Sequence, residues 1–536
     1  MSLASIKVGC SVIQLFTLKE GNQLVGRIIL ASLSGLMLAM PLLNPNWYIF
    51  SWCAFVPLLL AIEGKRKAYS YGLASVCGLV FYTCSCYWIS DYIHLFKGYG
   101  QNTSLVLSLI FWLYCSQLIA ILIVLFTWLK ERSLIHSFIL FPLVVVLAFE
   151  HFPMLFSVQL AETQSLFLTA IQGTDTVGVN GLDALIALVN ITLYHLLFRP
   201  QSTSYLTTSL VALVLCVWFT YGFNALSFWD NEINHWPTLP VGLVQPNETP
   251  DLAKPPIYPG FSQIYPPEMH ATQKLASLGA QWVIWPEARY KGYLDLPKVK
   301  KSFEREVKNM NVNLIFHDME QGSDKPSNEN IKNKAVFIDR HGQAAGQHQK
   351  IKLVAFGEYT PLVNTLPFVA DIFKDFFGNF TRQIIPGEGH KNFEHDGLNM
   401  IPLICNETMH SQFTAQAVGN TPRHMLIGLS SNGWFGKTLQ PYQHTYTSSL
   451  RAVENRLPFV HALNNGPSLA ILPSGREIFQ SEYHQAGAYL LQVPYLPKGS
   501  TSFYSRHPKL FMSCVYFCLT LVLLLIMRAG IRSLSY

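Results

Sequence analysis

The stretch IPLICNETMH, residues 401–410, ends an apolar run on a cysteine and then enters a polar turn. An apolar run of this length and composition predicts a buried strand, so Cys405 would stand at the strand's end. Between Trp229 and Pro508 it is the only cysteine in the chain. A lone cysteine in such a place is either a small buried hydrophobe or a nucleophile, and the surrounding segment has to distinguish the two.

Seven further stretches around Cys405 have the length and the β-branched or aromatic enrichment of strands. They are LPVGLVQ (239–245), AQWVIWPE (280–287), VNLIFHD (312–318), NKAVFID (333–339), HMLIGLSS (424–431), PFVHALN (458–464) and GAYLLQV (487–493). Residues 266–279 and 445–456 carry helical spacing instead. The segment therefore predicts a layered α/β domain. Glu287 closes one predicted strand and Cys405 nearly closes another, and strand ends are where catalytic groups gather in α/β sheets.

The composition of the whole chain indicates a membrane protein. Of 536 residues, 50% are hydrophobic and only 13% are charged, and the mean hydropathy is +0.25. The apolar runs crowd into residues 28–223 and return at 509–527. We therefore expect a membrane domain over 1–228, an exported catalytic domain over 229–508, and a final span with a short tail over 509–536.

Eight apolar stretches are long enough to approach the roughly 20 residues that cross a hydrocarbon core. Seven precede the exported domain and one follows it: 28–43, 47–62, 69–90, 104–128, 134–151, 181–198, 205–223 and 509–527. The first two are short and are joined by a tight turn at 44–46, so we expect a hairpin there.

Loop charges predict the orientation, because Lys and Arg are retained on the cytoplasmic side of a membrane. The basic residues that fall on one predicted side are Lys7, Lys19, Arg27, Lys65, Arg66, Lys67, Lys130, Arg132, Arg199, Arg528 and Arg532. The opposite short loops hold little positive charge beyond Lys97. Both termini would then lie in the cytoplasm, with the 229–508 domain on the outer side. The charged first 27 residues lack a small-residue cleavage site, so we expect no removable signal peptide.

Other chemistry-bearing motifs do not stand out. The chain has no Gly-rich phosphate loop, no His-Glu-x-x-His pattern and no paired Cys-x-x-Cys in the exported segment. We expect no metal and no cofactor. The net charge of +6 fits the basic loops better than it fits nucleic-acid binding.

Five motifs together resemble a known family. They are WPEARY around Glu287, HQKIKLVAFGEYTP around Lys350 and Glu358, PLICNE around Cys405, then SSNGWFG and RAVENRLPFVHALNNG. The set resembles the carbon–nitrogen hydrolase (nitrilase) superfamily and, more narrowly, the apolipoprotein N-acyltransferase family. The resemblance covers nearly the whole chain and implies an αββα sandwich inserted between transmembrane helices.

The resemblance also implies roles for individual residues. Cys405 would attack an acyl ester of a phospholipid such as phosphatidylethanolamine, and a diacylglyceryl-cysteine apolipoprotein would then accept the acyl chain from the thioester. Glu287 would be the base and Lys350 would stabilise the oxyanion. The supporting positions would be Glu358, Glu407, Asn406 and Trp434, with Trp434 lining the acyl pocket. The family resemblance further implies a bacterial inner membrane with the catalytic domain on the periplasmic side, and we expect a monomer.

Some positions depart from the family pattern, and some alternatives remain open on the sequence alone. Asn406 stands where a tyrosine is usual, Ala355 where a proline is usual, and His461 where Arg or Gln is commoner. The stretch after Gln245 lacks an expected tryptophan. Lys352 would face the same side of a strand as Lys350, and spacing alone does not choose between the two lysines.

Three functions follow as candidates. The first is the phospholipid-dependent N-acyltransferase. The second is a membrane-bound amidase or nitrilase-like hydrolase, in which water replaces the amine as acceptor. The third is an exported binding domain without catalysis. An acyl adduct on Cys405 separates the third from the other two, and an amine acceptor separates the first from the second.

Overall fold

The computed structural model describes residues 20–202, 204–249, 259–288, 290–321, 329–359 and 383–534. The chain divides into two compact units. We call residues 1–93, 99–224 and 509–536 the helical unit, and residues 94–98 and 225–508 the sandwich unit. The boundaries between the two units fall after Asn224 and Pro508. The sequence predicts them after residues 228 and 508.

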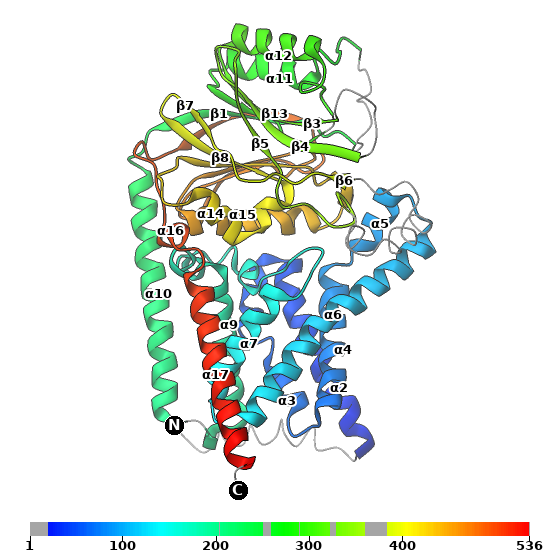
Figure 1. The fold of residues 1–536 in the computed structure, drawn as a ribbon, viewed down its shortest axis with the longest axis vertical. Coiled ribbons are helices and arrows are strands. Elements are labelled where there is room, and N and C mark those ends of the chain that lie inside the picture. The colour runs from blue at the N-terminus through cyan, green and yellow to red at the C-terminus, as the bar shows by residue number, and fades with distance from the viewer. Residues whose placement is uncertain are drawn as a thin grey trace. The chain divides into compact units, whose positions relative to one another are not determined.

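The helical unit contains long apolar helices joined by short connections (Figure 1). Its α-helices are α2 (Glu20–Leu43), α3 (Val56–Ile62), α4 (Lys67–Ser85), α5 (Ile89–Lys97), α6 (Gln101–Arg132), α7 (Ser137–His151), α8 (Leu168–Ile171), α9 (Thr174–Phe198), α10 (Tyr205–Ile233) and α17 (Leu510–Leu534). Helix α5 ends, and α10 continues, in the sandwich unit. Short 3₁₀ helices are η1 (Pro45–Trp52), η2 (Leu160–Gln164) and η3 (Pro200–Ser202).

The predicted count of eight membrane spans is not confirmed. Within the described residues, six helices are long and apolar enough to cross a membrane, or seven if a bent pair counts as one span. That pair is Lys67–Ser85 with Ile89–Leu95, bent by 54°. Helix α7 coincides with the fifth predicted span but has only 15 residues, which is short of the length that a straight crossing requires.

The basic loops of the helical unit lie at one end of it. Lys67 pairs with Glu131 at 2.7 Å, Arg199 pairs with Glu63, and Arg27 donates to the carbonyl of Glu63 at 3.3 Å. These contacts join the start of α4 to the end of α6, and the residue after α3 to α2 and to the end of α9. Loops that the charge pattern predicts on one side of the membrane are therefore neighbours in space.

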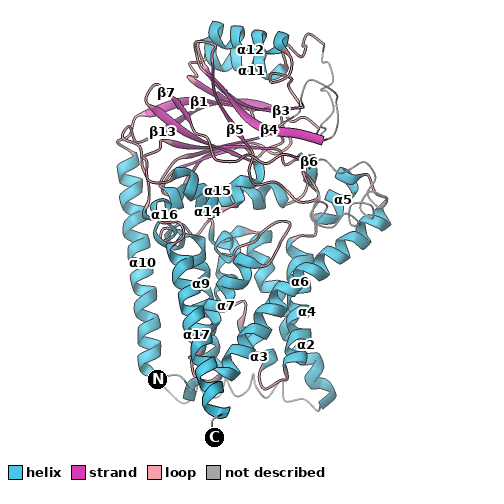
Figure 2. Ribbon diagram, viewed as in Figure 1, coloured by secondary structure: helices cyan, strands magenta, loops and turns pink. Residues whose placement is uncertain are grey.

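Two β-sheets form the centre of the sandwich unit (Figure 2). The first sheet has the order β13-β1-β2-β3-β4-β5 and the second β12-β11-β10-β9-β8-β7, with β6 paired to β4. The strands of the first sheet are β1 (Thr238–Gln245), β2 (Trp282–Ile284), β3 (Asn313–Glu320), β4 (Glu329–Ile338), β5 (Ala344–Gln349), β6 (Gln383–Ile384) and β13 (Gly487–Pro494). Those of the second are β7 (Phe393–His395), β8 (Leu398–Ile404), β9 (Met425–Ser430), β10 (Phe459–Leu463), β11 (Leu469–Ile471) and β12 (Glu477–Gln480). Strands β1, β2 and β3 run parallel, as do β8, β9 and β10.

Helices cover the outer face of each sheet (Figure 1). Helices α11 (Pro267–Ser277) and α12 (Pro297–Met310) lie on the first sheet, and α14 (Ser411–Val418) and α15 (Gln440–Asn455) on the second. The short elements are η5 (Cys405–Met409), η6 (Gly433–Phe435) and α16 (Phe503–Arg506). The order helix, sheet, sheet, helix is the αββα sandwich that the resemblance implies.

Alternation along single strands accounts for the layers, because successive side chains of a strand point to opposite faces. In β4, Ala335 and Phe337 pack between the two sheets, whereas Val336 and Ile338 pack beneath α11 and α12. The ring of Phe337 stacks on Trp282 with centroids 5.2 Å apart. Strands buried on both faces read as continuous apolar runs, and this is why the sequence reveals them.

Candidate active site

Two predicted catalytic positions stand just beyond the carboxyl ends of parallel strands from different sheets. Strand β2 ends at Ile284, so Glu287 lies in the following loop and does not close the strand as predicted. Strand β8 ends at Ile404, and Cys405 begins the 3₁₀ turn η5. Lys350 is the first residue after β5. Two sheets facing each other thus bring together residues that are more than 50 positions apart.

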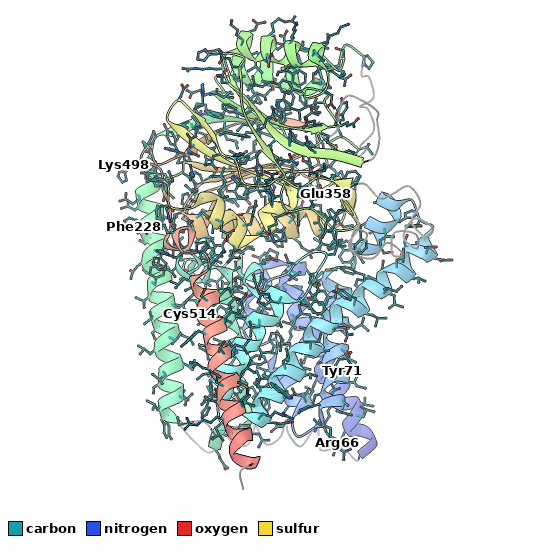
Figure 3. All side chains as sticks on the ribbon, viewed as in Figure 1. Arg66, Tyr71, Phe228, Glu358, Lys498 and Cys514 are labelled. Atoms are coloured by element: carbon teal, nitrogen blue, oxygen red, sulfur yellow. The ribbon has the colours of Figure 1, made fainter. Side chains whose placement is uncertain are left out.

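Lys350 lies between two carboxylates. Its Nζ donates to Glu358 Oε1 at 2.7 Å and stands 3.6 Å from Glu287 Oε1. Its side chain is 1% exposed. Glu358, labelled in Figure 3, lies in the turn after Lys350 and also accepts from the backbone N–H of Val354 at 2.8 Å. An ammonium group held by two fixed acceptors is oriented as well as neutralised.

The other predicted lysine has a different environment. Lys352 is exposed, and its Nζ lies 5.8 Å from the centre of the Phe413 ring. The geometry therefore separates two residues that spacing alone could not, and it is Lys350 that neighbours the carboxylates.

Asn333 is a site residue that the sequence reading missed. Its amide nitrogen donates to Glu287 Oε1 at 2.9 Å and lies 3.4 Å from Glu358 Oε1. Its Oδ1 meets His317 Nε2 at 2.8 Å. Because an amide nitrogen only donates, Oδ1 faces the ring and His317 carries its proton on Nε2. The sequence offers one signal, a polar residue inside the predicted strand NKAVFID, but nothing in it identifies the partners.

Cys405 holds an unusual backbone conformation. Its φ is +50°, in the left-handed region that residues with a Cβ rarely adopt. Such a conformation costs on the order of 1–3 kcal/mol and is kept where surrounding contacts enforce it, often at active sites. The thiol is partly exposed and donates a hydrogen bond to Glu287. The turn aims sulfur at the base while leaving it accessible.

Glu407 fastens this turn to the lysine segment. Its Oε1 accepts from the backbone N–H of Ile351 at 2.7 Å, and its Oε2 accepts from the N–H of Ile404 at 2.8 Å. His348 Nε2 also meets Oε2 at 3.0 Å. Glu407 is fully buried and bonds the residues next to Lys350 and Cys405. It supports both reactive groups through their backbones.

The remaining predicted positions surround the turn more loosely. Asn406 is partly exposed, and its amide nitrogen lies 3.3 Å from His410 Nε2. Trp434 lies in η6, four residues beyond the end of β9, and is partly exposed. His461, which departs from the family pattern and is not among the predicted site residues, is fully buried and bonds Ser430 at 2.7 Å.

The buried charges of the site lower the pKa of Glu287 and raise the pKa values of Cys405 and Lys350. Burial acts to raise the pKa of Glu287, but Lys350, His317 and the bonds from Asn333 and Cys405 outweigh it, so that pKa lies below its ordinary value. Burial and the neighbouring Glu287 raise the pKa of the Cys405 thiol. Lys350 keeps its proton, since the two carboxylates raise its pKa despite burial. At neutral pH the site therefore holds a thiol, a carboxylate and an ammonium group.

This arrangement fits covalent catalysis on an acyl group. A carboxylate with a bond to the thiol can take its proton as sulfur attacks, and a fixed cation stabilises the developing oxyanion. In the part of the chain that the structure describes, no group of three or more His, Cys, Asp or Glu side chains could hold a metal ion.

Two family models match the chain. Residues 34–192 match the apolipoprotein N-acyltransferase N-terminal domain. Residues 252–492 match the carbon–nitrogen hydrolase domain.

Curated relatives match nearly the full length. A protein of Geobacter metallireducens named apolipoprotein N-acyltransferase is 29% identical over 509 residues, which cover 91% of this chain and 93% of that protein. A protein of the same name from Bdellovibrio bacteriovorus is 25% identical, covering 88% and 89%. Among solved structures, a mutant amidase of the nitrilase superfamily from Nesterenkonia AN1 is 15% identical with a TM-score of 0.35, covering 48% of this chain and 90% of that one.

The sandwich and the carbon–nitrogen hydrolase match define the class, an enzyme domain of the nitrilase superfamily. With the N-terminal match and the full-length relatives, both parts of the chain are similar to apolipoprotein N-acyltransferases. It is an acyltransferase, and its long apolar helices indicate a membrane protein. The relatives named above are bacterial proteins.

Proposed function

We propose that this protein moves an acyl chain from a membrane phospholipid, through a thioester on Cys405, to the N-terminal amine of a diacylglyceryl-cysteine apolipoprotein. The donor is of the phosphatidylethanolamine type. The catalytic groups are Glu287, Lys350 and Cys405, which act without a metal or another cofactor. The protein works as a monomer.

In the first half-reaction the Cys405 sulfur attacks the carbonyl carbon of the sn-1 ester while Glu287 takes the thiol proton. Lys350 and a backbone N–H of the Cys405–Asn406 turn together stabilise the oxyanion. The ester C–O bond then breaks, and Glu287 returns the proton to the leaving oxygen. The products are a thioester and a lysophospholipid.

In the second half-reaction the lipoprotein amine attacks the thioester carbon. Glu287 removes a proton from the amine, the C–S bond breaks, and the thiol is restored with that proton. Glu287 thus serves first as a base and then as an acid in each half-reaction. Trp434 contributes to the wall of the acyl pocket.

The observation that carries the proposal is the thiol of Cys405 bonded to Glu287, beside a buried lysine, in a chain that is also rich in apolar helices. A hydrolase of water-soluble amides has no evident use for those helices. The basic loops gathered at one end of the helical unit support an orientation with that end in the cytoplasm. We therefore propose that the sandwich unit faces the periplasm from the inner membrane.

Intact-protein mass spectrometry tests the function directly. Purified protein is incubated with phosphatidylethanolamine, then with a diacylglyceryl-cysteine peptide, beside a Cys405→Ser variant. We expect a hydroxylamine-labile acyl mass on the wild type, its disappearance when peptide is added, and an N-acyl group on the peptide. Cys405→Ser should carry no hydroxylamine-labile mass, because serine forms an oxygen ester at most.

The alternatives give different results. An adduct that is lost to water, with no acylated peptide, would mean a hydrolase. A wild-type thiol that alkylates readily but gains no acyl mass would refute the donor assignment and leave a binding protein or an enzyme of another substrate.

Replacing Asn333 tests the bond that it donates to Glu287. Asn333→Leu removes the donor at similar volume, so the pKa of Glu287 should rise towards its ordinary value. A hydrogen bond to a charged group is worth about 1.5–3 kcal/mol, and we expect acylation to slow about 10-fold at pH 7. The acid limb of the rate profile should move to higher pH. An unchanged limb would show that Asn333 does not tune the base.

A further inference from the structure

Helix α15 contacts the nucleophile turn through two buried side chains on one face. His444 and Arg451 are seven residues apart, so they project in the same direction. Arg451 Nη1 donates to the carbonyls of Thr408 and Met409, at 3.4 and 3.1 Å. His444 Nε2 lies 2.8 Å from Thr408 Oγ1. His444 was not among the residues that the sequence pointed to.

The histidine reaches Cys405 through a short relay. The Thr408 hydroxyl donates to the carbonyl of Cys405 at 2.8 Å, and the ring of His444 also hydrogen-bonds the backbone of Cys405. On the other side of the ring, Nδ1 lies 2.9 Å from the Asn432 side-chain amide. His444 is 4% exposed and Asn432 is fully buried. Contacts on both ring nitrogens fix the orientation of the imidazole.

Counting donors assigns the tautomer. Burial lowers the pKa of His444 to about 4, so the ring is neutral and has one N–H. Thr408 has one O–H, which the Cys405 carbonyl accepts, so Thr408 Oγ1 can accept from His444 Nε2–H. Nδ1 then needs a donor. With its oxygen towards Nδ1, Asn432 leaves its amide nitrogen without a partner in the described structure. Turning the amide places that nitrogen on Nδ1, where it can donate.

We propose that His444 is a positioning residue for the nucleophile, with its Nε2–H holding the carbonyl of Cys405 through Thr408 so that the residue keeps its left-handed backbone. The inference rests on the proposed function, since it assigns a role within that same site. His444 touches neither the reacting sulfur nor a carboxylate in this scheme. It acts by keeping the turn in the one conformation that aims the thiol at Glu287.

Two substitutions separate this role from simple packing. The amide nitrogen of a glutamine can take the place of Nε2, whereas that of an asparagine reaches only the place of Nδ1. We expect His444→Gln to keep most of the acylation rate and His444→Asn to acylate about 10-fold more slowly. Small misplacements of a reacting group change rates by up to about 100-fold. The loss should appear in the maximal acylation rate and leave the KM for phospholipid unchanged.

His461 supplies the matched control. It is buried, its ring meets that of His444 edge to face with centroids 5.3 Å apart, and it bonds Ser430 and Ser448. His461→Gln should lower the thermal unfolding midpoint and leave the acylation rate of the folded protein unchanged. Equal losses of acylation rate in His444→Gln, His444→Asn and His461→Gln would mean that His444 contributes only packing, which would overturn the proposal. A wild-type rate in His444→Asn would also overturn it.

A second measurement keeps this inference separate from the function. If the wild type forms no thioester with phospholipid, the proposed function fails. The same variants are then compared by the rate at which iodoacetamide alkylates Cys405. A changed rate in His444→Asn, with His444→Gln and His461→Gln near wild type, would support the positioning role, and equal rates in all four proteins would refute it.

Discussion

Glu287→Gln should slow formation of the acyl-enzyme by about 10²- to 10⁴-fold, the usual contribution of a positioned general base. Glutamine has the same shape, and its oxygen can still accept the amide hydrogen of Asn333. Lys350 keeps Glu358 as an acceptor at 2.7 Å. The substitution therefore removes the base and leaves the packing and the cation in place.

The pH dependence identifies the base more specifically. Since Lys350 and its other neighbours lower the pKa of Glu287, the wild-type rate should hold through neutral pH and fall only as pH drops below the ordinary carboxyl range, near about 4.3. Glu287→Gln should lack that acid limb. Its slow rate should instead rise at alkaline pH, where the thiol ionises without a base.

Single-turnover acylation between pH 4 and 10 measures both effects. Glu358→Gln is the matched control, because Glu358 bonds Lys350 from the other side and has no hydrogen bond to Cys405 among the interactions described. We expect acylation by Glu358→Gln to be about 10-fold slower than wild type, with the acid limb of its pH profile retained. If Glu358→Gln lost the limb and Glu287→Gln kept it, the assignment of the base would have to be exchanged.

Most strands that sequence reasoning found are buried on both faces, although β13, at an edge of the first sheet, is only partly buried. Strands β8, β9 and β10 read as unbroken apolar runs because helices cover one side of their sheet and the other sheet covers the opposite side. Two other edge strands, β5 and β12, carry no such signal. Half of the residues of β5, AAGQHQ, are exposed, and so are most of those of β12. Because neither strand has a hydrophobic face to bury, neither shows the alternation of apolar and polar residues that predicts a strand.

The candidate catalytic positions came from the family resemblance and, for Glu287 and Cys405, also from their places near the ends of predicted strands. What the sequence could not show is the second set of contacts. Asn333 meets Glu287 across 46 positions of the chain, and His444 meets Thr408 across 36. In the sequence each of these side chains is an ordinary polar residue, and only the folded chain brings it to the partners that identify its role.

Two predicted spans stay unconfirmed because the length and straightness of their helices decide whether they cross. The third predicted span, at 69–90, is interrupted between α4 and α5, where the two helices diverge by 54°. The fifth span falls on α7, which carries Pro142 within its 15 residues. Hydropathy measures how apolar a stretch is, whereas a crossing also needs continuous helical length.

Lys350→Met should lower both the acylation rate and the stability of the fold. Methionine fills similar volume without charge, so the oxyanion loses its cation and acylation should fall about 10²- to 10³-fold, as when a preorganised oxyanion donor is removed. The fold loses as well, because Glu287 and Glu358 would remain buried without a positive partner. Breaking a buried ion pair by removing one member costs about 3–5 kcal/mol.

That loss should depend on pH in a defined direction. In the wild type the lowered pKa of Glu287 adds stability above the ordinary carboxyl pKa, and this is lost as pH falls through the lowered value. Without Lys350, burial dominates and the pKa of Glu287 rises above its ordinary value. The variant is then most stable when the carboxyls are protonated, so its deficit relative to wild type should grow from pH 5 to pH 8.

Thermal unfolding midpoints of the detergent-solubilised full chain at pH 5, 6, 7 and 8 measure this difference, with Lys352→Met as the control. Lys352 is exposed above the Phe413 ring, and its removal should change neither the midpoint by more than a degree or so nor the pH slope, as expected for a surface charge. A constant deficit across the pH range would mean that Lys350 contributes packing and not charge. If acylation slowed more in Lys352→Met than in Lys350→Met, the oxyanion role would pass to the exposed lysine, because a cation that stabilises the reaction must be the one whose removal slows it.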